Sequence, residues 1–448
     1  MAEDECFKQR LSHVYSNESE RFQLKDRNYS RQYAHIYASR LEHNKSYLEE
    51  KCRRTWGCDI PLKKISELVA DEKCAIIGTL FKQMIYKPNI LKEISEENQL
   101  EPQPIREKYT DSSDVLILED DLQRILLVGN VESMKAITGV TAAILGCQDS
   151  NSGKFQVEDI IYKDLNPNIR SELNCNKESY VVLLSGLEIG GDDKDAAELL
   201  MSVQLLIDLL NGSIGDEDIE NKMSKVLRVI IAGNSLSSKI IEKDIISHGK
   251  HKKRHNRQND NEEEKESRDA IDKLDNFLFQ LSINAYVDLM PGPTDPTTFT
   301  LPQKPIHRCL LPKSGALSTL NPVSNPYECK IEGYNFLGTS GQPVKDVVRI
   351  TEYEDELEVL EGMLKFGHLA PTAPDTLGCY PFEEADPFII DVCPDVFFAG
   401  NCKKFDWKKY ENVSEKHTLL ITIPSFKVTK TAVLLNLYDL TCSPISLP

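Results

Sequence analysis

The chain has 448 residues, with 40% hydrophobic and 28% charged side chains and a formal net charge of −18. This length supports two or three domains with real cores, and the composition excludes a disordered or collagen-like chain. The acidic balance repels a phosphate backbone, so we expect the chain alone to bind DNA weakly or not at all. No apolar run is long enough to cross a membrane and the N-terminus MAEDECFKQR is charged, which predicts a protein of the cytosol or nucleus with no membrane partner.

The cysteines give no sign of a metal site. Twelve are spread singly along the chain, and no C-x-x-C pair occurs. Because a zinc ribbon needs such pairs, we expect reduced and mostly buried thiols in a reducing compartment.

The N-terminal region predicts a tail followed by a helix. Residues 1–25 are polar and are expected to be loose, and a helix fits Ser30–Arg53. Four residues recur at helical spacing and make one apolar, aromatic face of this helix: Tyr33, Ile36, Tyr37 and Leu41. This face either packs on its own domain or docks on a partner, and the sequence leaves both interpretations open.

Short strands dominate residues 60–167. The expected strands are Cys74–Lys82, Leu116–Leu118, Ile125–Val128, Val140–Gly146 and Phe155–Tyr162. They predict a small barrel of the oligonucleotide-binding (OB) type, so residues 26–167 should form a domain of one helix and one barrel. These strands carry few aromatic or basic residues, which favours an architectural or protein-binding barrel over one that binds single strands.

Strands and helices alternate from Ser179 to the C-terminus. The expected helices are Ala196–Leu210 and Ala270–Leu281, and the expected strands are Tyr180–Leu184, Val226–Ala232, Val287–Met290, Val396–Ala399, Thr418–Ile423 and Thr431–Leu437. This alternation requires crossovers and a buried, partly parallel sheet, which predicts an α/β sandwich over residues 179–448. The whole chain is therefore expected to be a mixed α+β protein.

A charged insertion interrupts this sandwich at residues 247–269, basic in its first half and acidic in its second. Its composition cannot support a core, so we expect a solvated loop. The basic half either faces solvent only, or serves as a nuclear localisation signal or a DNA contact.

The strand ends of the sandwich lack the ligands of a two-metal phosphoesterase. Such an enzyme places Asp, Asn and His there, in motifs such as D-x-H and G-H-x-H, to hold two cations that activate a water. The residues at these positions are Ser185, Leu187, Asn234, Ser237, Asp295, Asn401 and Lys403. The turn glycines persist while the ligands are gone, and Lys403 would add a positive charge where cations should sit. No nucleotide-binding glycine loop or nucleophile motif occurs either, so we expect no metal, no cofactor and no catalytic residue.

Several long strings carry a family resemblance. They are SRQYAHIYASRL at 30–41, PNILKEIS at 88–95, VLILEDDLQRI at 115–125, VEDIIYKDL at 157–165, VIIAGNSLS at 229–237, DLMPGPTDPTTFTLPQ at 288–303, FLGTSGQ at 336–342 and HLAPTAPDTLGCYPF at 368–382. From about Phe22 to its C-terminus, the chain resembles the small (second, regulatory) subunits of eukaryotic DNA polymerase delta, in the DNA polymerase B-subunit family.

The resemblance implies an OB-type domain followed by an inactive phosphoesterase domain of the calcineurin-like type. It also implies a nuclear, non-catalytic scaffold in DNA replication and repair synthesis. The implied partners are the C-terminal module of the polymerase delta catalytic subunit and an accessory subunit, which links the complex to the sliding clamp.

Two other interpretations stay open. In the first, the chain is a divergent active metallophosphoesterase, which would need ligands from elsewhere: Asp295, Asp375, Asp386 and His368. In the second, it is the equivalent subunit of polymerase alpha or epsilon, which would share the fold, although the strings at 30–41 and 368–382 favour delta.

For the partner surface, we expect the end of the sheet and its loops, Asp375–Pro387 included, to make the first contact. The cysteine and prolines of this loop indicate a rigid, irregular surface, and its candidate contact residues are Asp375, Tyr380 and Phe382. The aromatic face of Ser30–Arg53 is the second candidate.

Overall fold

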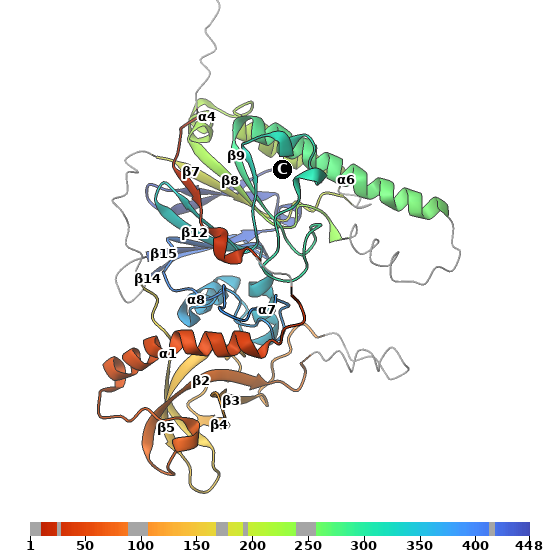
Figure 1. Ribbon diagram of the computed structural model, residues 1–448. Helices are drawn as coiled ribbons and strands as arrows, with labels where there is room; N and C mark the ends of the chain where they lie inside the picture. Colours follow the sequence, from red (N-terminus) through yellow and green to blue (C-terminus); the bar gives the residue numbers. More distant parts are fainter. Residues whose placement is uncertain are drawn as a thin grey trace, which may run out of the picture. The chain divides into compact units, whose positions relative to one another are not determined.

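The structure is a computed structural model that describes residues 10–24, 28–87, 106–166, 178–190, 196–238, 257–411 and 417–448, with only the backbone of 257–264. The chain divides into two compact units (Figure 1). The sandwich unit is formed by Met1–Lys25, Asn168–Gln342 and Pro394–Pro448, and the barrel unit by Asp26–Pro167 and Pro343–Cys393. The expected boundary at residues 179–448 is therefore wrong for 343–393. This segment joins the barrel unit because buried polar contacts of Arg40 and Lys82 hold it there.

Two six-stranded sheets build the sandwich unit. The first has the order β1-β11-β12-β13-β15-β14 and the second the order β10-β9-β8-β7-β16-β17. The strands of the first are β1 (Tyr15–Asn17), β11 (Tyr327–Ile331), β12 (Tyr334–Thr339), β13 (Val396–Cys402), β14 (Asp406–Glu411) and β15 (His417–Pro424). Those of the second are β7 (Tyr180–Leu184), β8 (Val226–Ala232), β9 (Tyr286–Met290), β10 (Leu320–Pro322), β16 (Thr431–Asn436) and β17 (Thr441–Ser446). The partly parallel sheet predicted from the alternation is confirmed, since β7, β8, β9 and β10 run parallel.

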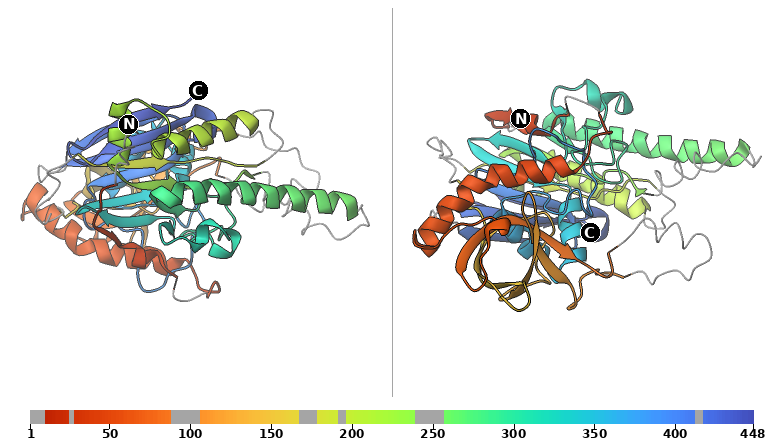
Figure 2. Two further views of the ribbon diagram at one scale, coloured as in Figure 1. Left: turned by 90° about the horizontal axis from the view of Figure 1, so that it is seen from above. Right: turned by 60° about the horizontal axis from the view of Figure 1, so that its bottom comes forward.

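The fully apolar runs of the central strands are explained by burial on both faces. One face of the second sheet packs on the first sheet, with Val181, Ile230 and Phe398 in the shared core. The other face is covered by helices and holds Val182 and Val229 in a separate core. The helices are α3 (Ala196–Leu210), α4 (Glu217–Ser224), α6 (Arg257–Asn284) and the short α9 (Phe426–Thr429). Figure 2 shows α3 and α6 lying side by side over the sheet.

Helix α6 begins earlier than the sequence indicated. It starts at Arg257, so the expected solvated loop is wrong for residues 257–269. Glu, Lys, Arg and Gln are good helix formers, and acidic side chains near a helix N-terminus are favoured by the helix dipole. A polar stretch can therefore extend an amphipathic helix without contributing to a core. The basic residues 247–256 lie outside the described part of the chain, as does the string at 88–95.

The structure describes residues 10–24 of the N-terminal segment, which form a strand and a 3₁₀ helix, so the loose tail expected for residues 1–25 is wrong for 10–24. Strand β1 pairs with β11, with Tyr15 opposite Ile331. The 3₁₀ helix η1 (Ser19–Phe22) follows, and Phe22 is buried. A three-residue strand is too short to show alternation, which is why its polar sequence gave no signal.

The barrel unit is a closed five-stranded barrel, in the order β2-β3-β4-β6-β5. Its elements are α1 (Ala34–Trp56), the 3₁₀ helix η2 (Ile65–Glu67), β2 (Lys73–Gln83), β3 (Val115–Glu119), β4 (Arg124–Gly129), β5 (Thr141–Gln148), β6 (Phe155–Ile161) and α8 (Glu356–Phe366). Helix α7 spans Gln342–Ile350. Its first residue is the last of a sandwich-unit segment, and the rest of the helix belongs to the barrel unit. Helix α1 lies across the barrel (Figure 1), where Leu48 and Cys52 pack on Ala143 and Ile161.

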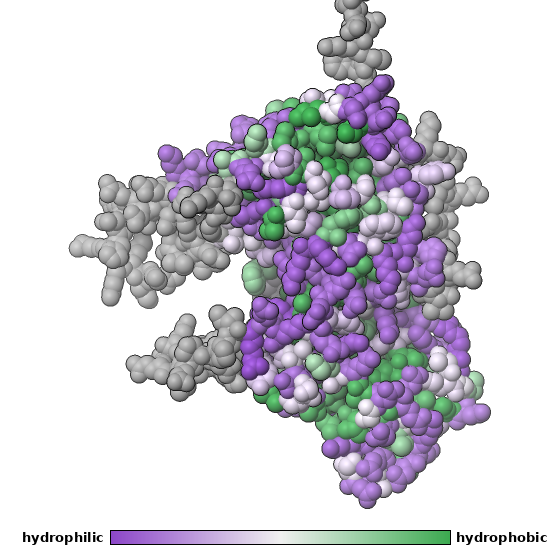
Figure 3. Space-filling view, turned by 180° about the vertical axis from the view of Figure 1, so that it is seen from behind, coloured by the Kyte–Doolittle hydropathy of each residue, from purple (hydrophilic) through white to green (hydrophobic). Residues whose placement is uncertain are grey.

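Hydrophilic side chains prevail on the face shown in Figure 3, and hydrophobic ones gather there in separate patches. None of the described helices is both long enough and apolar enough to span a membrane.

Candidate functional site

The structure brings several of the predicted strand-end residues together at one edge of the sandwich. Ser185 follows β7, and the turn after it is bonded to the turn after β8 through Gly186 N–H and the Gly233 carbonyl, 3.0 Å apart. Asp295, in the loop after β9, accepts a bond from Leu236 N–H at 2.9 Å. Asn401, in the bulged end of β13, donates its N–H to Ser185 Oγ at 2.8 Å.

The Ser185 hydroxyl and the Asn401 amide nitrogen form hydrogen bonds inside the protein, whereas Asn401 Oδ1 is buried without a hydrogen-bond partner among the described residues. Ser185 Oγ can donate to the carbonyls of Ile423 and Pro424, at 3.2 and 3.0 Å. Asn401 Nδ2 donates to the carbonyls of Ala232, at 3.2 Å, and Ser340, at 2.9 Å. Both side chains are buried. They tie the strand ends of the two sheets to each other.

Left-handed backbone explains why glycine and asparagine persist in these turns. Gly186 has φ +64°, Gly233 has φ +83° and Asn234 has φ +54°. This region penalises residues with a Cβ, and asparagine tolerates it better than most. A Cβ on Gly186 would also lie 2.8 Å from Asn401 Oδ1. Glycine and asparagine therefore fit these turns, whose side chains form bonds within the protein.

Asp295 is the one carboxylate that remains among these positions. It is buried, and its two oxygens accept from Leu236 N–H, at 2.9 Å, and Gly292 N–H, at 2.8 Å. Burial raises the pKa of this carboxyl to about 6, although the backbone N–H groups act in the opposite direction. The side chain therefore joins the loop after β8 to the loop after β9.

The remaining strand-end residues offer no ligand set. Leu187 lies in the apolar core under the helices, Ser237 is buried, and Lys403 is exposed. Within the described ranges, no three His, Cys, Asp or Glu side chains are grouped so that they could hold a metal ion. A dinuclear centre needs several anionic and imidazole ligands, and this donor set does not fit one.

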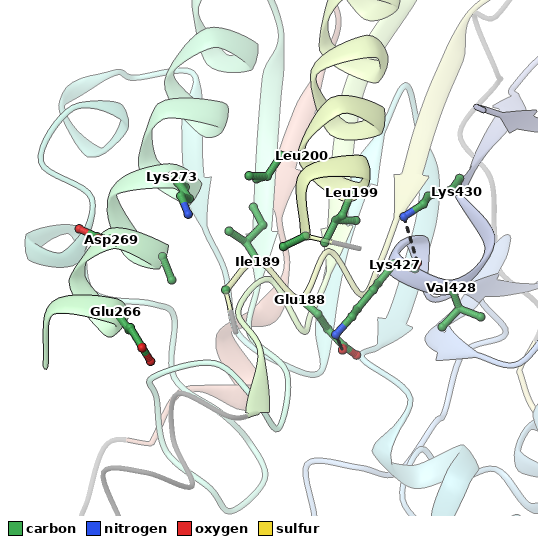
Figure 4. Close-up of a pocket in the computed structure, with 13 residues that line it drawn as sticks. Glu188, Ile189, Leu199, Leu200, Glu266, Asp269, Lys273, Lys427, Val428 and Lys430 are labelled. Atoms are coloured by element: carbon green, nitrogen blue, oxygen red, sulfur yellow. Dashed lines mark hydrogen bonds and ion pairs between the residues drawn. The ribbon is translucent and has the colours of Figure 1, made fainter. Parts of the chain in front are cut away.

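A hollow of about 410 Å³ opens beside this edge, between α3, α6 and α9 (Figure 4). Lys427 Nζ lies 3.3 Å from Glu188 Oε2, and Lys430 Nζ donates to the Lys427 carbonyl at 3.2 Å. Glu266 and Asp269 come from α6 on the opposite wall. The hollow has an apolar floor and opposite charges on its walls, and none of its described lining residues is a nucleophile paired with a base.

The structure buries only the aliphatic members of the predicted helical face, whereas Tyr33, which precedes α1, is 43% exposed. Ile36 and Leu41 are buried, and the Tyr33 hydroxyl donates to the Cys379 carbonyl at 3.0 Å. The Arg40 guanidinium lies 5.4 Å from the centre of the Tyr37 ring. Ile36 and Leu41 are thus core residues. For these two positions, the helical face packs on its own domain, which is the first of the two interpretations that the sequence left open.

The loop 375–387 contacts the start of this helix, so both predicted partner surfaces belong to one region of the barrel unit. Tyr380 is buried and its hydroxyl accepts from Asn28 N–H at 3.1 Å. The Phe382 ring stacks edge-on against Tyr380, with centroids 5.1 Å apart. Asp375 forms an ion pair with Lys87. Tyr29 remains about half exposed beside Tyr380, which leaves an aromatic surface at this point.

A buried charge network holds this loop, and the sequence did not reveal it. The Arg40 guanidinium, 1% exposed, donates to Asp386 Oδ2 at 2.8 Å and to the carbonyls of Gly139, Pro371 and Ala373. Burial opposes the charge on Asp386, but Arg40 and His368 outweigh it and lower the pKa of the carboxyl. The one available signal was an arginine inside the apolar stripe of a predicted helix.

His368 completes the network as a neutral ring. Its Nε2 lies 2.8 Å from Asp386 Oδ2, and its Nδ1 accepts from Ala370 N–H at 3.1 Å. Because Nδ1 is an acceptor, the proton of the neutral ring is on Nε2. Burial and the charge of Arg40 lower the pKa of His368 to about 4. Asp386 and His368 therefore both belong to this network.

Two family models match the chain. Residues 32–160 match the OB-fold domain of DNA polymerase delta subunits, and residues 181–407 match the B-subunit of DNA polymerase alpha/epsilon. The DNA polymerase delta subunit 2 of Drosophila melanogaster is 38% identical, over 98% of both chains. The chain belongs to the family of DNA polymerase delta small subunits. Other members include the small subunit of Arabidopsis thaliana, 36% identical over 99% of this chain and 98% of that protein. The Saccharomyces cerevisiae small subunit is 30% identical over 96% of this chain and 93% of that protein.

Membership of the delta small-subunit family confirms the resemblance read from the strings. The OB-fold match covers most of α1 and the barrel, which confirms the OB type of this domain. The second match begins in β7 and ends in β14, and thus spans the strand ends of the sandwich unit.

Proposed function

We propose that the chain is the non-catalytic scaffold subunit of the nuclear DNA polymerase delta holoenzyme, acting in DNA replication and repair synthesis. In this role it bridges the C-terminal module of the catalytic subunit and an accessory subunit that links the complex to the sliding clamp. Its sandwich unit is a calcineurin-like phosphoesterase domain whose metal site has been lost.

One observation carries the non-catalytic part of this proposal. Ser185 and Asn401 occupy positions where a dinuclear phosphoesterase needs ligands, and the Ser185 hydroxyl and the Asn401 amide nitrogen bond to backbone carbonyls instead. Asp295, the remaining acid, accepts backbone N–H groups from two loops. The same bonds fasten the strand ends, which suits a rigid platform for other chains.

For the partner surface, we propose the region where loop 375–387 meets the start of α1. The aromatic groups Tyr29 and Phe382 lie there beside two exposed acids, Glu383 and Glu384. Aromatic side chains dominate many protein interfaces because they bury a large area at a small cost in conformational entropy. The buried network of Arg40 keeps the loop in one shape before a partner arrives.

The scaffold role is tested by co-expressing the full chain with the catalytic and accessory subunits and measuring the complex by size-exclusion chromatography. We expect one stable complex, weakened by the double variant Glu383→Lys/Glu384→Lys. The matched control is Glu358→Lys, an exposed acid on α8 of the same unit. A wild-type chain that joins neither subunit would refute the scaffold role, and an intact complex with the double variant would refute the surface.

The loss of catalysis needs a separate measurement. Elemental analysis of the purified chain for manganese and iron, together with hydrolysis of bis-p-nitrophenyl phosphate, should show no stoichiometric metal and no turnover. Bound metal with turnover that a chelator abolishes would favour the divergent phosphoesterase.

A further inference from the structure

Two neighbouring hollows form a continuous groove on the barrel unit, and no described residue of loop 375–387 lines it. They measure about 240 and 330 Å³ and share Glu49 and Leu62 in their linings. The groove runs between the C-terminal part of α1, residues 60–67 and the turn between β3 and β4. Its apolar lining is formed by Leu41, Cys52, Trp56, Ile60, Leu62, Ala75, Ile77 and Leu122.

The rim of this groove exposes large apolar side chains. Leu122, at the tip of the β3–β4 turn, is 76% exposed, and Leu62 is 39% exposed. Exposed leucines that stand singly need no explanation, but these two border the same hollow. Covering them would recover about 25 cal/mol for each Å² of apolar surface removed from water.

Hydrogen bonds hold the groove walls in place before anything binds. Asp120 Oδ1 accepts from the backbone N–H of Leu122, at 2.8 Å, and of Gln123, at 2.7 Å. Asp120 Oδ2 accepts from Ile65 N–H at 3.0 Å and so joins the turn to η2. At the other end, Trp56 Nε1 donates to Asp159 Oδ2 at 2.8 Å. A preformed site loses less conformational entropy on binding than a mobile one.

The charges along the groove favour a basic occupant. The first hollow is lined by five acids, Glu42, Glu49, Glu67, Asp120 and Asp121, and by three lysines, Lys45, Lys63 and Lys64. Lys63 forms an ion pair with Glu72, which lies outside the lining. The second hollow adds Arg53, which lies 3.8 Å from Glu49 within the lining, so the other four acids of the groove outnumber its other two lysines. Such a surface repels the phosphates of a nucleic acid and attracts lysine or arginine.

We propose that this groove is a second docking site, which receives a basic segment of a partner subunit and anchors one large apolar side chain of that segment beside Leu62 and Leu122. The proposal rests on the scaffold role proposed above. It concerns a surface distinct from loop 375–387, and its occupant is defined by an apolar anchor flanked by positive charge.

The test uses the full chain co-expressed with the catalytic and accessory subunits, and measures the Kd of each subunit for the variants. Leu122→Glu should weaken binding of one of the two subunits by about tenfold or more, as expected for loss of an apolar anchor. Asp121→Lys should weaken the same subunit, and added salt should reduce the difference between this variant and the wild type. The matched control is Ile85→Glu, which is 59% exposed on the same unit outside the groove.

The outcomes separate the groove from the scaffold role. If wild-type chain binds both subunits and Leu122→Glu binds them equally well, the groove is not a docking site and the scaffold role stands. If Asp121→Lys strengthens binding, the occupant is not basic and the proposal fails. Single-stranded oligonucleotide that binds the chain more weakly after Leu122→Glu would also overturn it, because the groove would then serve nucleic acid.

Discussion

Replacing Arg40 by methionine tests whether the buried charge network holds the barrel unit together. The change removes the partner of Asp386 and leaves that carboxylate with two bonds, from His368 and from Phe388 N–H. It also removes the donors for the carbonyls of Gly139 and Ala373, which lie 2.8 and 2.9 Å from the guanidinium. Methionine fills much of the space but supplies none of these bonds.

The expected cost follows from the burial of both charged groups. Side-chain exposure is 1% for Arg40 and 0% for Asp386, so solvent cannot replace the lost partner. Removing one member of a buried ion pair costs about 3–5 kcal/mol. We therefore expect Arg40→Met to lower the free energy of unfolding of the barrel unit by about 4 kcal/mol.

Each unit contains one of the two tryptophans, so the unfolding of each can be followed separately. In a Trp407→Phe background, the fluorescence of Trp56 reports urea unfolding of the barrel unit. The control is Arg53→Met, on the same helix, whose side chain is 65% exposed and pairs only loosely with Glu49 at 3.8 Å. This control should cost less than about 1 kcal/mol.

A second observation checks the mechanism of the loss. Without Arg40, the pKa of His368 should rise, because the guanidinium is one of the causes that lower it. Protonated His368 could then pair with Asp386, so the cost should be smaller near about pH 5 than near about pH 8. If Arg40→Met costs no more than Arg53→Met at either pH, the network does not stabilise the unit and the reasoning is wrong.

Three further predictions concern single residues. The pKa of His368 is about 4 in the folded protein and 6.5 in the unfolded chain, so protonation favours unfolding. As the pH falls from 6.5 to about 4, the free energy of unfolding of the wild type should therefore decrease by up to about 3 kcal/mol relative to that of His368→Gln, measured by urea titration. Equal decreases in the two proteins would contradict this prediction. Asp295→Ala leaves the buried N–H groups of Leu236 and Gly292 without an acceptor. It should lower the free energy of unfolding of the sandwich unit by about 2 kcal/mol or more, measured by Trp407 fluorescence in a Trp56→Phe background. An unchanged unfolding midpoint would show that Asp295 does not hold the two loops together. In the same assay, Gly338→Ala should lower the free energy of unfolding by about 1–3 kcal/mol, because the new Cβ would lie 2.1 Å from the Phe398 ring. Adding Phe398→Leu should recover part of this loss. A Gly338→Ala variant with unchanged stability would show that the ring can move.

The hydrophobic pattern predicted α1, α3, part of α6, the five barrel strands and six strands of the sandwich unit, but not β11, β12, α7 or α8. Helix α3 has the predicted bounds Ala196–Leu210, and β2 differs from its prediction by one residue at each end. These segments have strong periodicity or a continuous apolar run, which burial of one face or two faces imposes directly. The strand-end residues Ser185, Asn234, Asp295 and Asn401 could also be picked out, since parallel strands bring their carboxyl ends to one edge.

Three features could not be predicted from local sequence. The start of α6 lies in a polar stretch, where helix propensity acts without an apolar pattern. Strand β1 exists because β11 offers it an edge. The joining of residues 343–393 to the barrel unit depends on contacts such as Arg40 with Asp386, which are 346 positions apart.

The sequence by itself thus determined the OB type of the first domain and the mixed α/β sheets of the second, because periodicity and residue identity are local properties of the chain. Only the tertiary structure decided which apolar side chains are exposed to solvent. Ile36 and Leu41 form part of a predicted apolar face but are buried, whereas Leu122 is exposed at the rim of a groove. The physical reason is that burial depends on which distant segments of the chain pack together. A helix or strand pattern indicates only that its apolar face must be covered by another element.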